Sequence, residues 1–332
     1  MKTVRCSIIG FGVIGQGVAE VLLRKKEFLE SLGLDVRVVA VADSKGATIA
    51  PEGVDLAGCL ASKREKGTVA LEKLTGPEVI RTVEHELVIE TTPTNIKTGE
   101  PGLENMFTAF EMGRDVITSN KGPLAMKYRE LVKTAKASGC RFRFEATVGG
   151  AMPVINLINE ILAGNRVKSI KGIFNGTCNY ILSRMLEEKA TYKDILAESI
   201  ELGIAETDPR YDVEGIDTAC KLVILANAIF GLDATYRDVE VTGITKITPE
   251  ALDMAYKNGH VIKLIGDVSR KGIHVAPRLV PINHPLAVGG TLNVASVDTE
   301  LAGEITVTGK GAGSIETASA VLSDLLAIYR EC

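Results

Sequence analysis

The sequence predicts an α/β fold, in which a doubly wound parallel sheet is followed by a second α+β domain. Three observations lead to this prediction. Short apolar strands alternate with helical stretches in the first 135 residues or so, which is typical of a parallel sheet covered on both faces. A glycine-rich turn joins the first strand to the first helix. After Gly139 several strands are separated by turns, and this spacing predicts a separate sheet.

The first domain is expected to cover residues 1–135. Its predicted strands are apolar and rich in β-branched residues, and they lie at 4–9, 36–42, 87–90 and 115–118. Helical stretches separate them, the clearest at about 16–32 and 102–112.

The second domain is expected to cover residues 136–313. Its predicted strands lie at 141–146, 168–174, 273–279, 291–296 and 304–308. Its predicted helices lie at 153–162, 180–188, 192–202 and 217–230. The first is predicted because its apolar residues recur at helical spacing. A last helix within residues 314–330 is a candidate to pack on the first domain.

Composition excludes several classes of partner. The chain has 332 residues with 38 Lys plus Arg and 42 Asp plus Glu, so its net charge of −4 and the lack of a basic cluster argue against nucleic acid. No apolar run approaches the roughly 20 residues of a membrane helix, and no signal peptide precedes the first strand. The six cysteines form no C-x-x-C pair, and a cytoplasmic protein without zinc or disulfides is expected. Cys332 is expected to be a free thiol.

A glycine motif predicts a dinucleotide site. It follows a strand directly and opens a helix, and it reads Gly10-Phe11-Gly12-Val13-Ile14-Gly15, which matches G-x-G-x-x-G. The first glycine permits a tight turn, the second lets the backbone approach a pyrophosphate, and the third lets helix and strand pack closely. Amide groups at the helix N-terminus then face the anion. The first domain is therefore expected to be of the Rossmann type.

The end of the second strand bears on which coenzyme binds. Asp43 stands where a carboxylate can accept a hydrogen bond from the ribose 2′-hydroxyl of NAD and would repel the 2′-phosphate of NADP. Ser44 and Lys45 follow, and Lys63 and Arg64 lie beyond, so cations able to accept NADP are also near. The same cations would suit a solvated turn. NAD and NADP both stay open, with a slight preference for dual use.

Two further strand ends are expected to reach the nicotinamide. Ligands of open α/β sheets bind beyond the carboxyl ends of the strands. Thr92 follows one such strand, and Ser119 and Lys121 follow the next. A lone lysine at a strand end is also typical of a surface charge, so Lys121 needs support from elsewhere.

The segment 202–221 gathers charge at the start of an apolar helix. Asp217 and Lys221 are four residues apart and share a helix face, while Glu206 and Asp212 lie in the preceding loop. Asp217 as a cap with a surface ion pair is the alternative. Because charges are costly to bury unless they are paired or bind a ligand, four of them at one helix entrance favour a site.

The same segment resembles the signature of homoserine dehydrogenases. The positions in register are Gly203, Asp208, Pro209, Asp212, Gly215, Asp217 and Lys221, whereas Ser199 stands where the pattern usually has Ala. The likeness covers nearly the whole chain, and three more stretches carry it. They are Asn175-Gly176-Thr177-Cys178-Asn179-Tyr180-Ile181-Leu182, the glycine loop at 145–153 and a late glycine loop at 309–314.

The resemblance implies an NAD(P)-dependent enzyme that interconverts L-homoserine and L-aspartate 4-semialdehyde in threonine, methionine and isoleucine biosynthesis. It also implies a homodimer, and no appended regulatory domain is expected. The implied catalytic residues are Lys221, Asp217 and Lys121. The implied substrate-binding residues are Glu206, Asp212, Lys121, Asn175, Gly176 and Thr177. The late loop, with Gly311 and Gly313, would close over the cofactor. A sodium ion would bind the backbone carbonyls of Glu145, Val148, Gly150 and Met152.

Two rival functions fit the same fold. One is another semialdehyde or amino-acid dehydrogenase, such as aspartate-semialdehyde dehydrogenase. The chemistry of that enzyme needs a cysteine nucleophile with a base, and no cysteine here has an evident histidine partner. The other is a non-catalytic NAD(P)-sensing protein, which fold alone does not exclude. The charged set of Lys121, Lys221 and the acidic residues disfavours it.

Overall fold

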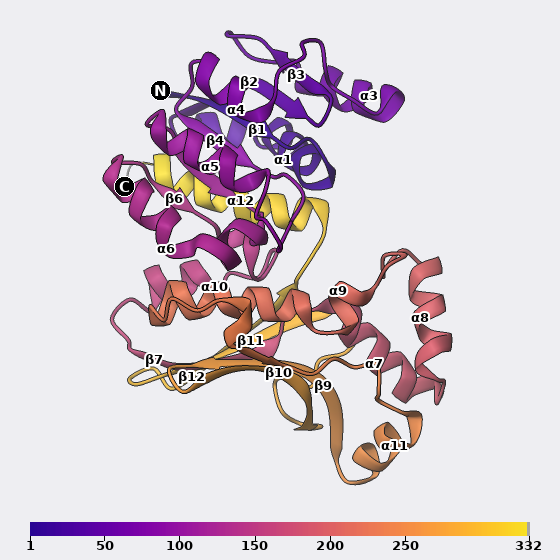
Figure 1. Ribbon diagram of the computed structural model, residues 1–332. Helices are drawn as coiled ribbons and strands as arrows, with labels where there is room; N and C mark the ends of the chain where they lie inside the picture. The colour runs from indigo at the N-terminus through magenta and orange to yellow at the C-terminus, as the bar shows by residue number, and fades with distance from the viewer. Residues whose placement is uncertain (331–332) are drawn as a thin grey trace. The chain divides into compact units, whose positions relative to one another are not determined.

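The structure is a computed structural model that describes residues 1–330, and the chain divides into two compact units (Figure 1). The first unit comprises Met1–Ala151 and the C-terminal segment from Gly313, and the second comprises Met152–Ala312. The first unit thus extends past the boundary expected at residue 135 and includes the last helix. Cys332 lies outside the described residues. None of the helices within residues 1–330 has the length and apolar character needed to cross a membrane.

The first unit is built on a six-stranded sheet with the order β3-β2-β1-β4-β5-β6. The strands are β1 (Lys2–Ile9), β2 (Leu34–Asp43), β3 (Gly46–Ile49), β4 (Leu87–Glu90), β5 (Asp115–Thr118) and β6 (Phe142–Arg143). All neighbours are parallel except β3, which runs antiparallel to β2. The connections leave β1 toward β2 and later return to β4 on its other side, and ligands bind at such switch points. The predicted fold class is confirmed.

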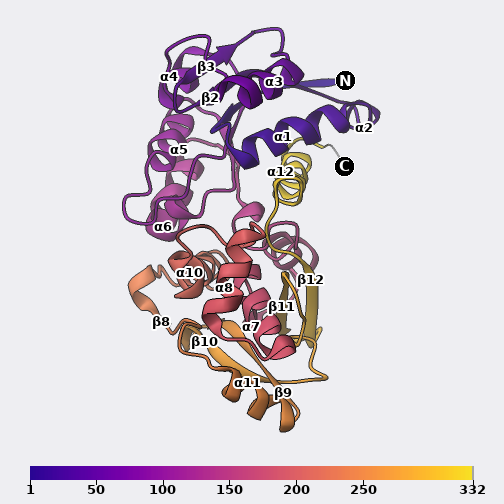
Figure 2. The ribbon, with the colours of Figure 1, turned by 90° about the vertical axis from the view of Figure 1, so that its right-hand side faces the viewer.

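Seven α-helices accompany this sheet in the described residues. They are α1 (Val13–Arg24), α2 (Lys26–Ser31), α3 (Leu56–Lys66), α4 (Gly76–Thr82), α5 (Gly102–Glu111), α6 (Lys121–Ala137) and α12 (Ser314–Tyr329). Figure 2 shows α12 beside α1, and Val321 and Leu325 join Val18 and Leu22 in one apolar cluster. The last helix therefore completes the core of the first unit.

Three local predictions are wrong. The single helix expected at 16–32 is broken at Lys25, where three consecutive cations favour a helix C-terminus because they face the negative end of its dipole. The strand expected at 141–146 is only β6, followed by a 3₁₀ turn at Glu145–Thr147. The helix expected at 153–162 is one wide π-helical turn, Leu157–Ile161, which leaves Ile161 exposed although its spacing predicted burial.

The second unit has its own six-stranded sheet, with the order β12-β11-β7-β9-β10-β8. The strands are β7 (Val167–Ile173), β8 (Val239–Val241), β9 (His260–Ser269), β10 (Gly272–Pro281), β11 (Leu292–Thr299) and β12 (Glu304–Lys310). Every neighbouring pair is antiparallel except β8 and β10. The sequence did not predict β8 or β9. The helices are α7 (Gly176–Glu188), α8 (Tyr192–Glu201), α9 (Arg210–Val213), α10 (Ile216–Phe230) and α11 (Pro249–Lys257).

Helix α10 is the central element of this unit. It lies against the sheet (Figure 1), and Gly266 on β9 lets it come close, because an added Cβ would lie 3.0 Å from the Thr218 side chain and 3.1 Å from that of Leu222. The helix is apolar around most of its surface, as expected of a buried helix. Its first two turns nevertheless carry Asp217 and Lys221, and both are buried with it.

Candidate active site

The glycine loop between β1 and α1 has the geometry of a dinucleotide site. Gly10 has φ +104°, and a Cβ there would lie 2.5 Å from the backbone of Thr91 and Thr92 at the end of β4. A Cβ on Gly15 would lie 2.2 Å from the Gly10 carbonyl oxygen, so helix and loop need both glycines. By contrast, a Cβ on Gly12 would meet nothing within 4 Å.

The start of α1 is also open for an anion. Gly12 is the N-cap residue of the helix, and no side chain caps the first amide groups. Open space in front of Gly12 and uncapped amides at a helix N-terminus fit a pyrophosphate. The residues present therefore suit NAD or NADP at this loop.

The late glycine loop leads into the same region of the first unit. Gly313 has φ +127°, and the Ser314 hydroxyl donates to the Val13 carbonyl oxygen at 2.8 Å. Gly17 on α1 is required there, because a Cβ would lie 2.4 Å from Ser314 Oγ. Gly311, in the second unit, is equally constrained, since a Cβ would lie 1.8 Å from the Asn293 amide nitrogen. Their contact with the cofactor stays a prediction.

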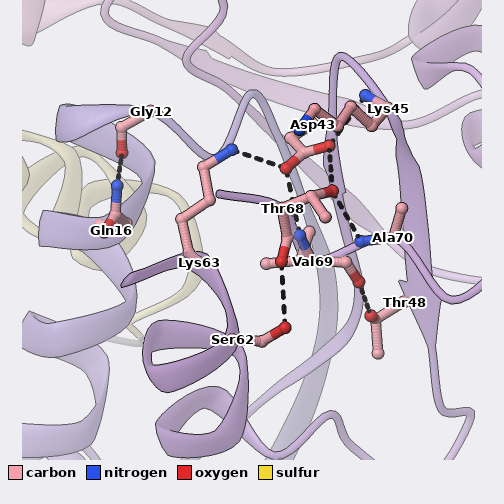
Figure 3. A network of polar contacts seen from close by, with 10 residues as sticks. All are labelled: Gly12, Gln16, Asp43, Lys45, Thr48, Ser62, Lys63, Thr68, Val69 and Ala70. Atoms are coloured by element: carbon pink, nitrogen blue, oxygen red, sulfur yellow. Dashed lines mark hydrogen bonds and ion pairs between the residues drawn. The ribbon is translucent and has the colours of Figure 1, made fainter. Parts of the chain in front are cut away.

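Asp43 is the centre of a polar network at the end of β2 (Figure 3). Its Oδ1 accepts from the Lys45 amide at 2.9 Å and from the Thr68 hydroxyl at 3.1 Å. Its Oδ2 accepts from Lys63 Nζ at 2.6 Å and from the Val69 amide at 3.1 Å. Burial on its own would raise the pKa of Asp43, but the hydrogen bonds from Lys63 and the two amides outweigh it and lower that pKa.

This network argues against the role expected for Asp43. A carboxylate has about four acceptor positions, and the four donors around Asp43 fill them. Only 4% of the side chain is exposed, so a ribose hydroxyl would have to displace a donor. The charge of Lys63 is likewise paired. Lys45 and Arg64, whose side chains are exposed, and the neighbouring Ser44 are left as candidates to face a 2′-substituent.

The ends of β4 and β5 form a second hydrogen-bonded group. The Ser119 amide donates to the Glu90 carbonyl oxygen at 3.2 Å, and Asn120 caps α6 by accepting from the Gly122 amide at 3.1 Å. The Asn120 amide nitrogen also donates to the Thr92 hydroxyl at 3.2 Å. Thr92, Ser119 and Lys121 therefore belong to one hydrogen-bonded region at the ends of β4 and β5 and the start of α6. Glu90 and Asn120 were not predicted as part of it, although a glutamate closing the apolar strand Leu87–Glu90 is a signal that could have found the first.

In the second unit, a cluster of buried polar groups surrounds the start of α10. Lys221 Nζ donates to Asp217 Oδ2 at 2.6 Å and to the Phe174 carbonyl oxygen at 2.5 Å. The exposed fraction is 6% for Lys221 and 5% for Asp217, so the ion pair is almost withdrawn from solvent. The sequence placed these two residues on one helix face, and the structure joins them.

Asn175 links that pair to Asp212. Its amide nitrogen donates to Asp212 Oδ1 at 2.7 Å and to Asp217 Oδ2 at 3.0 Å, so it bridges two carboxylates. Its Oδ1 accepts from the Cys178 amide at 2.8 Å and caps α7. Both ends of the Asn175 side chain are thus engaged by the protein. This geometry favours a positioning role over the direct substrate contact that the resemblance implied.

The neighbouring substrate-binding candidates have different surroundings. Gly176 must be glycine, because a Cβ would lie 2.6 Å from the Thr291 carbonyl oxygen. Thr177 donates to the Ile204 carbonyl oxygen at 3.1 Å, which ties α7 to the loop before α9. Glu206 in that loop is exposed, and no hydrogen bond or ion pair to another described residue is found for it. Three of the four expected groups therefore come together, and Glu206 stays apart.

The predicted sodium loop is a buried, irregular turn. Glu145, Val148 and Met152 are almost completely buried, and Gly150 turns the chain with φ +60°. Backbone carbonyl oxygens in such a turn suit a hard cation. No cluster of three or more His, Cys, Asp or Glu side chains that could hold a metal is found within residues 1–330.

Comparisons with known proteins agree on one family. A profile described as "Homoserine dehydrogenase" matches residues 153–326, and one described as "Homoserine dehydrogenase, NAD binding domain" matches residues 10–145. A "Homoserine dehydrogenase" of Methanocaldococcus jannaschii is 50% identical, with 97% of each chain covered. An "NAD(+)-dependent homoserine dehydrogenase" of Pseudomonas canavaninivorans is 34% identical, and the match covers 99% of this chain and 97% of that one.

Solved structures give the same result. One from Archaeoglobus fulgidus has a TM-score of 0.94 at 50% identity, covering 99% of this chain and 100% of that one. A "Hyperthermophilic archaeal homoserine dehydrogenase in complex with NADPH" has a TM-score of 0.86 at 29% identity, and the match covers 98% of this chain and 97% of that one.

Proposed function

Because the chain belongs to the homoserine dehydrogenase family, we propose that the buried cluster at the start of α10 carries the reaction, with Lys221 as the proton carrier. The enzyme is an NAD(P)-dependent oxidoreductase that interconverts L-homoserine and L-aspartate 4-semialdehyde. The observation behind the proposal is the Lys221–Asp217 ion pair, which is buried at 2.6 Å beside a second carboxylate, Asp212.

The bound nicotinamide supplies the hydride chemistry, and the protein supplies position and proton transfer. In the reductive direction the Lys221 ammonium donates a proton to the carbonyl oxygen of the semialdehyde. In the oxidative direction the neutral amine accepts the hydroxyl proton of homoserine. Asp217 and the Phe174 carbonyl oxygen hold Nζ in one place, because both accept hydrogen bonds from it. Lys121 is proposed to assist at the reacting oxygen.

Homoserine also carries an ammonium and a carboxylate that must be recognised. Glu206 is proposed as the ammonium partner, since its exposed carboxylate is bound to no other described side chain. Asp212 is proposed to act beside it, in the orientation that Asn175 imposes. Gly176 and Thr177 stay proposals for the substrate contact.

Either coenzyme is proposed to bind at the glycine loop. Gly10, Gly12 and Gly15 shape the loop, and the uncapped amides at the start of α1 would face the pyrophosphate. Lys45 and Arg64 are proposed to face the 2′-phosphate of NADP, because Lys63 is already paired with Asp43. Among the relatives, one is named for NAD and one was solved with NADPH.

A sodium ion at the carbonyls of Glu145, Val148, Gly150 and Met152 is proposed on the fit of that buried turn. Exchanging sodium for a bulky organic cation at constant ionic strength is expected to lower activity or thermal stability. No change in either would contradict the site.

A cytoplasmic homodimer is proposed from the resemblance. Light scattering of the purified protein is expected to give twice the mass of one 35.4 kDa chain. A monomer at the concentration of the assay would contradict it.

Replacing Lys221 with methionine tests the central assignment. Lys221→Met keeps the length and apolar contacts of the side chain but removes the proton carrier. We expect kcat to fall by about 10³-fold, the usual scale of general acid–base catalysis, while NADPH affinity measured by fluorescence stays unchanged. Lys171→Met, which removes an exposed lysine of β7, is the control and is expected to keep wild-type kcat. Turnover by Lys221→Met at a rate near that of the control would refute the assignment.

Glu206→Gln tests the ammonium contact separately. The substitution is expected to raise KM for homoserine by about tenfold with a smaller effect on kcat, because it removes an interaction made by bound substrate and transition state alike. An unchanged KM would remove Glu206 from the site.

A further inference from the structure

Glu90 is a buried carboxylate to which neither the family resemblance nor the reaction assigns a role. It is the last residue of β4, and its exposed fraction is 0%. One carboxylate oxygen accepts from the Thr92 amide at 3.0 Å and from the Thr92 hydroxyl, and the other accepts from the Thr118 hydroxyl at 2.9 Å. All these donors are neutral, and no ion pair of Glu90 is found among the residues described.

Such an arrangement lowers the stability of the fold. Burying a carboxylate without a cation destabilises a fold unless hydrogen bonds compensate, and burial here raises the pKa of Glu90. The preceding residues Val88 and Ile89 are fully buried and apolar, and an apolar residue in place of Glu90 would continue that pattern. The reason for a carboxylate at this position must therefore lie in the groups that donate hydrogen bonds to it, those of Thr92 and Thr118.

The carboxylate closes a ring of hydrogen bonds between two strand ends. Thr118, which donates to Glu90, accepts from the Asn120 amide at 3.0 Å. The Asn120 side chain in turn donates to the Thr92 hydroxyl at 3.2 Å, and that hydroxyl donates to Glu90. Thr118 and Asn120 are also buried, with exposed fractions of 0% and 1%. The ring therefore fixes the end of β4 against the end of β5.

The ring reaches the first turn of α6 as well. Asn120 caps this helix by accepting from the Gly122 amide at 3.1 Å, and Lys121 is the first helical residue. Gly122 leaves no room for adjustment, because a Cβ would lie 2.6 Å from the Asn95 carbonyl oxygen. A change at Glu90 is thus passed to both Thr92 and the backbone of Lys121.

We propose that Glu90 is a positioning residue for the nicotinamide end of the coenzyme site. Its carboxylate holds Thr92 and, through Thr118 and Asn120, the backbone of Lys121 in one geometry. The inference rests on the proposed function in one respect, namely that Thr92 and Lys121 face the nicotinamide. It adds a residue that touches neither coenzyme nor substrate and acts through those that do.

A structural carboxylate on the next strand provides the comparison. Asp115 begins β5, so it lies at the amino ends of the parallel strands, whereas Glu90 lies at their carboxyl ends. It accepts from Arg141 Nε at 3.0 Å and from the Tyr329 hydroxyl at 2.8 Å. It has a cation as its partner and joins β5 to β6 and α12. Asp115→Asn is therefore the matched control for a loss of stability without a local effect at the nicotinamide.

The experiment compares two ligands on Glu90→Gln. Glutamine keeps the volume, but its amide nitrogen cannot accept from a threonine hydroxyl. NADPH carries the nicotinamide, whereas 2′-phospho-ADP-ribose lacks only that ring and keeps the adenosine, the pyrophosphate and the second ribose. We expect Glu90→Gln to weaken NADPH by about tenfold, a loss of about 1.4 kcal/mol, and to lower kcat by about tenfold or more. Affinity for 2′-phospho-ADP-ribose should stay within about twofold of wild type.

Each other outcome overturns the proposal. Equal weakening of both ligands would mean that Glu90 supports the whole domain, and unchanged NADPH affinity with unchanged kcat would mean that it does nothing for the site. Asp115→Asn should lower the melting temperature without changing the ratio of the two affinities. If Glu90→Gln does not fold, Thr118→Val removes one bond of the ring, and the same selective loss is required of it. The comparison of the two affinities is a binding measurement, so it stands even if Lys221→Met were to stay active.

Discussion

Two lysine–aspartate pairs of almost identical geometry lie in the two units. Lys63 Nζ is 2.6 Å from Asp43 Oδ2 in the first unit, and Lys221 Nζ is 2.6 Å from Asp217 Oδ2 in the second. Both aspartates lie at the end of a secondary-structure element, and the sequence predicted a ligand role for both. Their surroundings differ, and the difference separates a structural pair from the pair that we propose to react.

The Asp43 pair is built from the stretch of chain that directly follows β2. Its four donors lie between Lys45 and Val69, and two of them are backbone amides. The carboxylate holds the turn after β2 to the segment that follows α3 (Figure 3). With its acceptor positions filled, Asp43 has no capacity for a ligand that does not displace a donor.

The Asp217 pair is built from distant segments. Lys221 and the Asn175 side chain donate to the same oxygen of Asp217, and Asn175 also holds Asp212. Phe174 and Asn175 follow β7, whereas Asp212 belongs to α9. Side chains brought from three elements to one buried point are what a catalytic cluster needs, because their positions are set by packing rather than by a local turn.

The largest effect outside the ion pair is expected at Asn175. Asn175→Ser keeps a good N-cap for α7 but is too short to bridge Asp212 and Asp217. We expect kcat to fall by about tenfold or more with less than about 1 kcal/mol of lost stability. Steady-state kinetics and urea unfolding measure the two quantities. A variant with wild-type kcat would show that the bridge is dispensable and would weaken the contrast with Asp43.

A different outcome is expected at the structural pair. Lys63→Met should lower the free energy of unfolding by about 2 kcal/mol, because it leaves a buried carboxylate without its cation, while kcat stays within about threefold of wild type. The freed charge of Asp43 should also favour NADH over NADPH in binding, since a carboxylate repels a 2′-phosphate. Urea unfolding and coenzyme titrations check both statements. A large loss of kcat would place Lys63 in the reaction.

The smallest effect concerns pH and a buried group outside the proposed site. His85 is fully buried, bonded to the Ser7 hydroxyl at 3.0 Å and to the Val83 carbonyl oxygen at 2.8 Å, and burial lowers its pKa to about 4. Its ordinary pKa is near 6.5. Between these values the unfolded chain binds a proton that the folded chain does not, so stability falls as pH falls from about 6.5 to 4.

A His85→Gln variant isolates that contribution. The slope of its free energy of unfolding against pH should be smaller across this range than that of the wild type. The difference in slope should correspond to the uptake of at most one proton on unfolding. Activity at neutral pH should be unchanged, because His85 lies outside the site. Parallel curves for the two proteins would mean that His85 titrates normally in the fold.

The sequence predicted the parts of this account that depend on local pattern. The glycine loop requires positive φ and close approach, which only glycine permits, and the i to i+4 spacing of Asp217 and Lys221 is fixed by the helix. Side-chain partners from other segments are not in such patterns. That is why the sequence did not predict the four donors around Asp43, the separation of Glu206 from the buried cluster or the hydrogen bonds of Glu90.

The most direct test of the contrast compares Asp217→Asn with Asp43→Asn in one assay of homoserine oxidation at saturating substrate and coenzyme. Asp217→Asn is expected to lose about 10²-fold in kcat, because Lys221 loses the anion that holds its proton-transfer group in place. Asp43→Asn is expected to stay within about threefold of wild-type kcat while it unfolds at a lower urea concentration. Equal losses of kcat in the two variants, or a greater loss in Asp43→Asn, would contradict the assignment of catalysis to the start of α10.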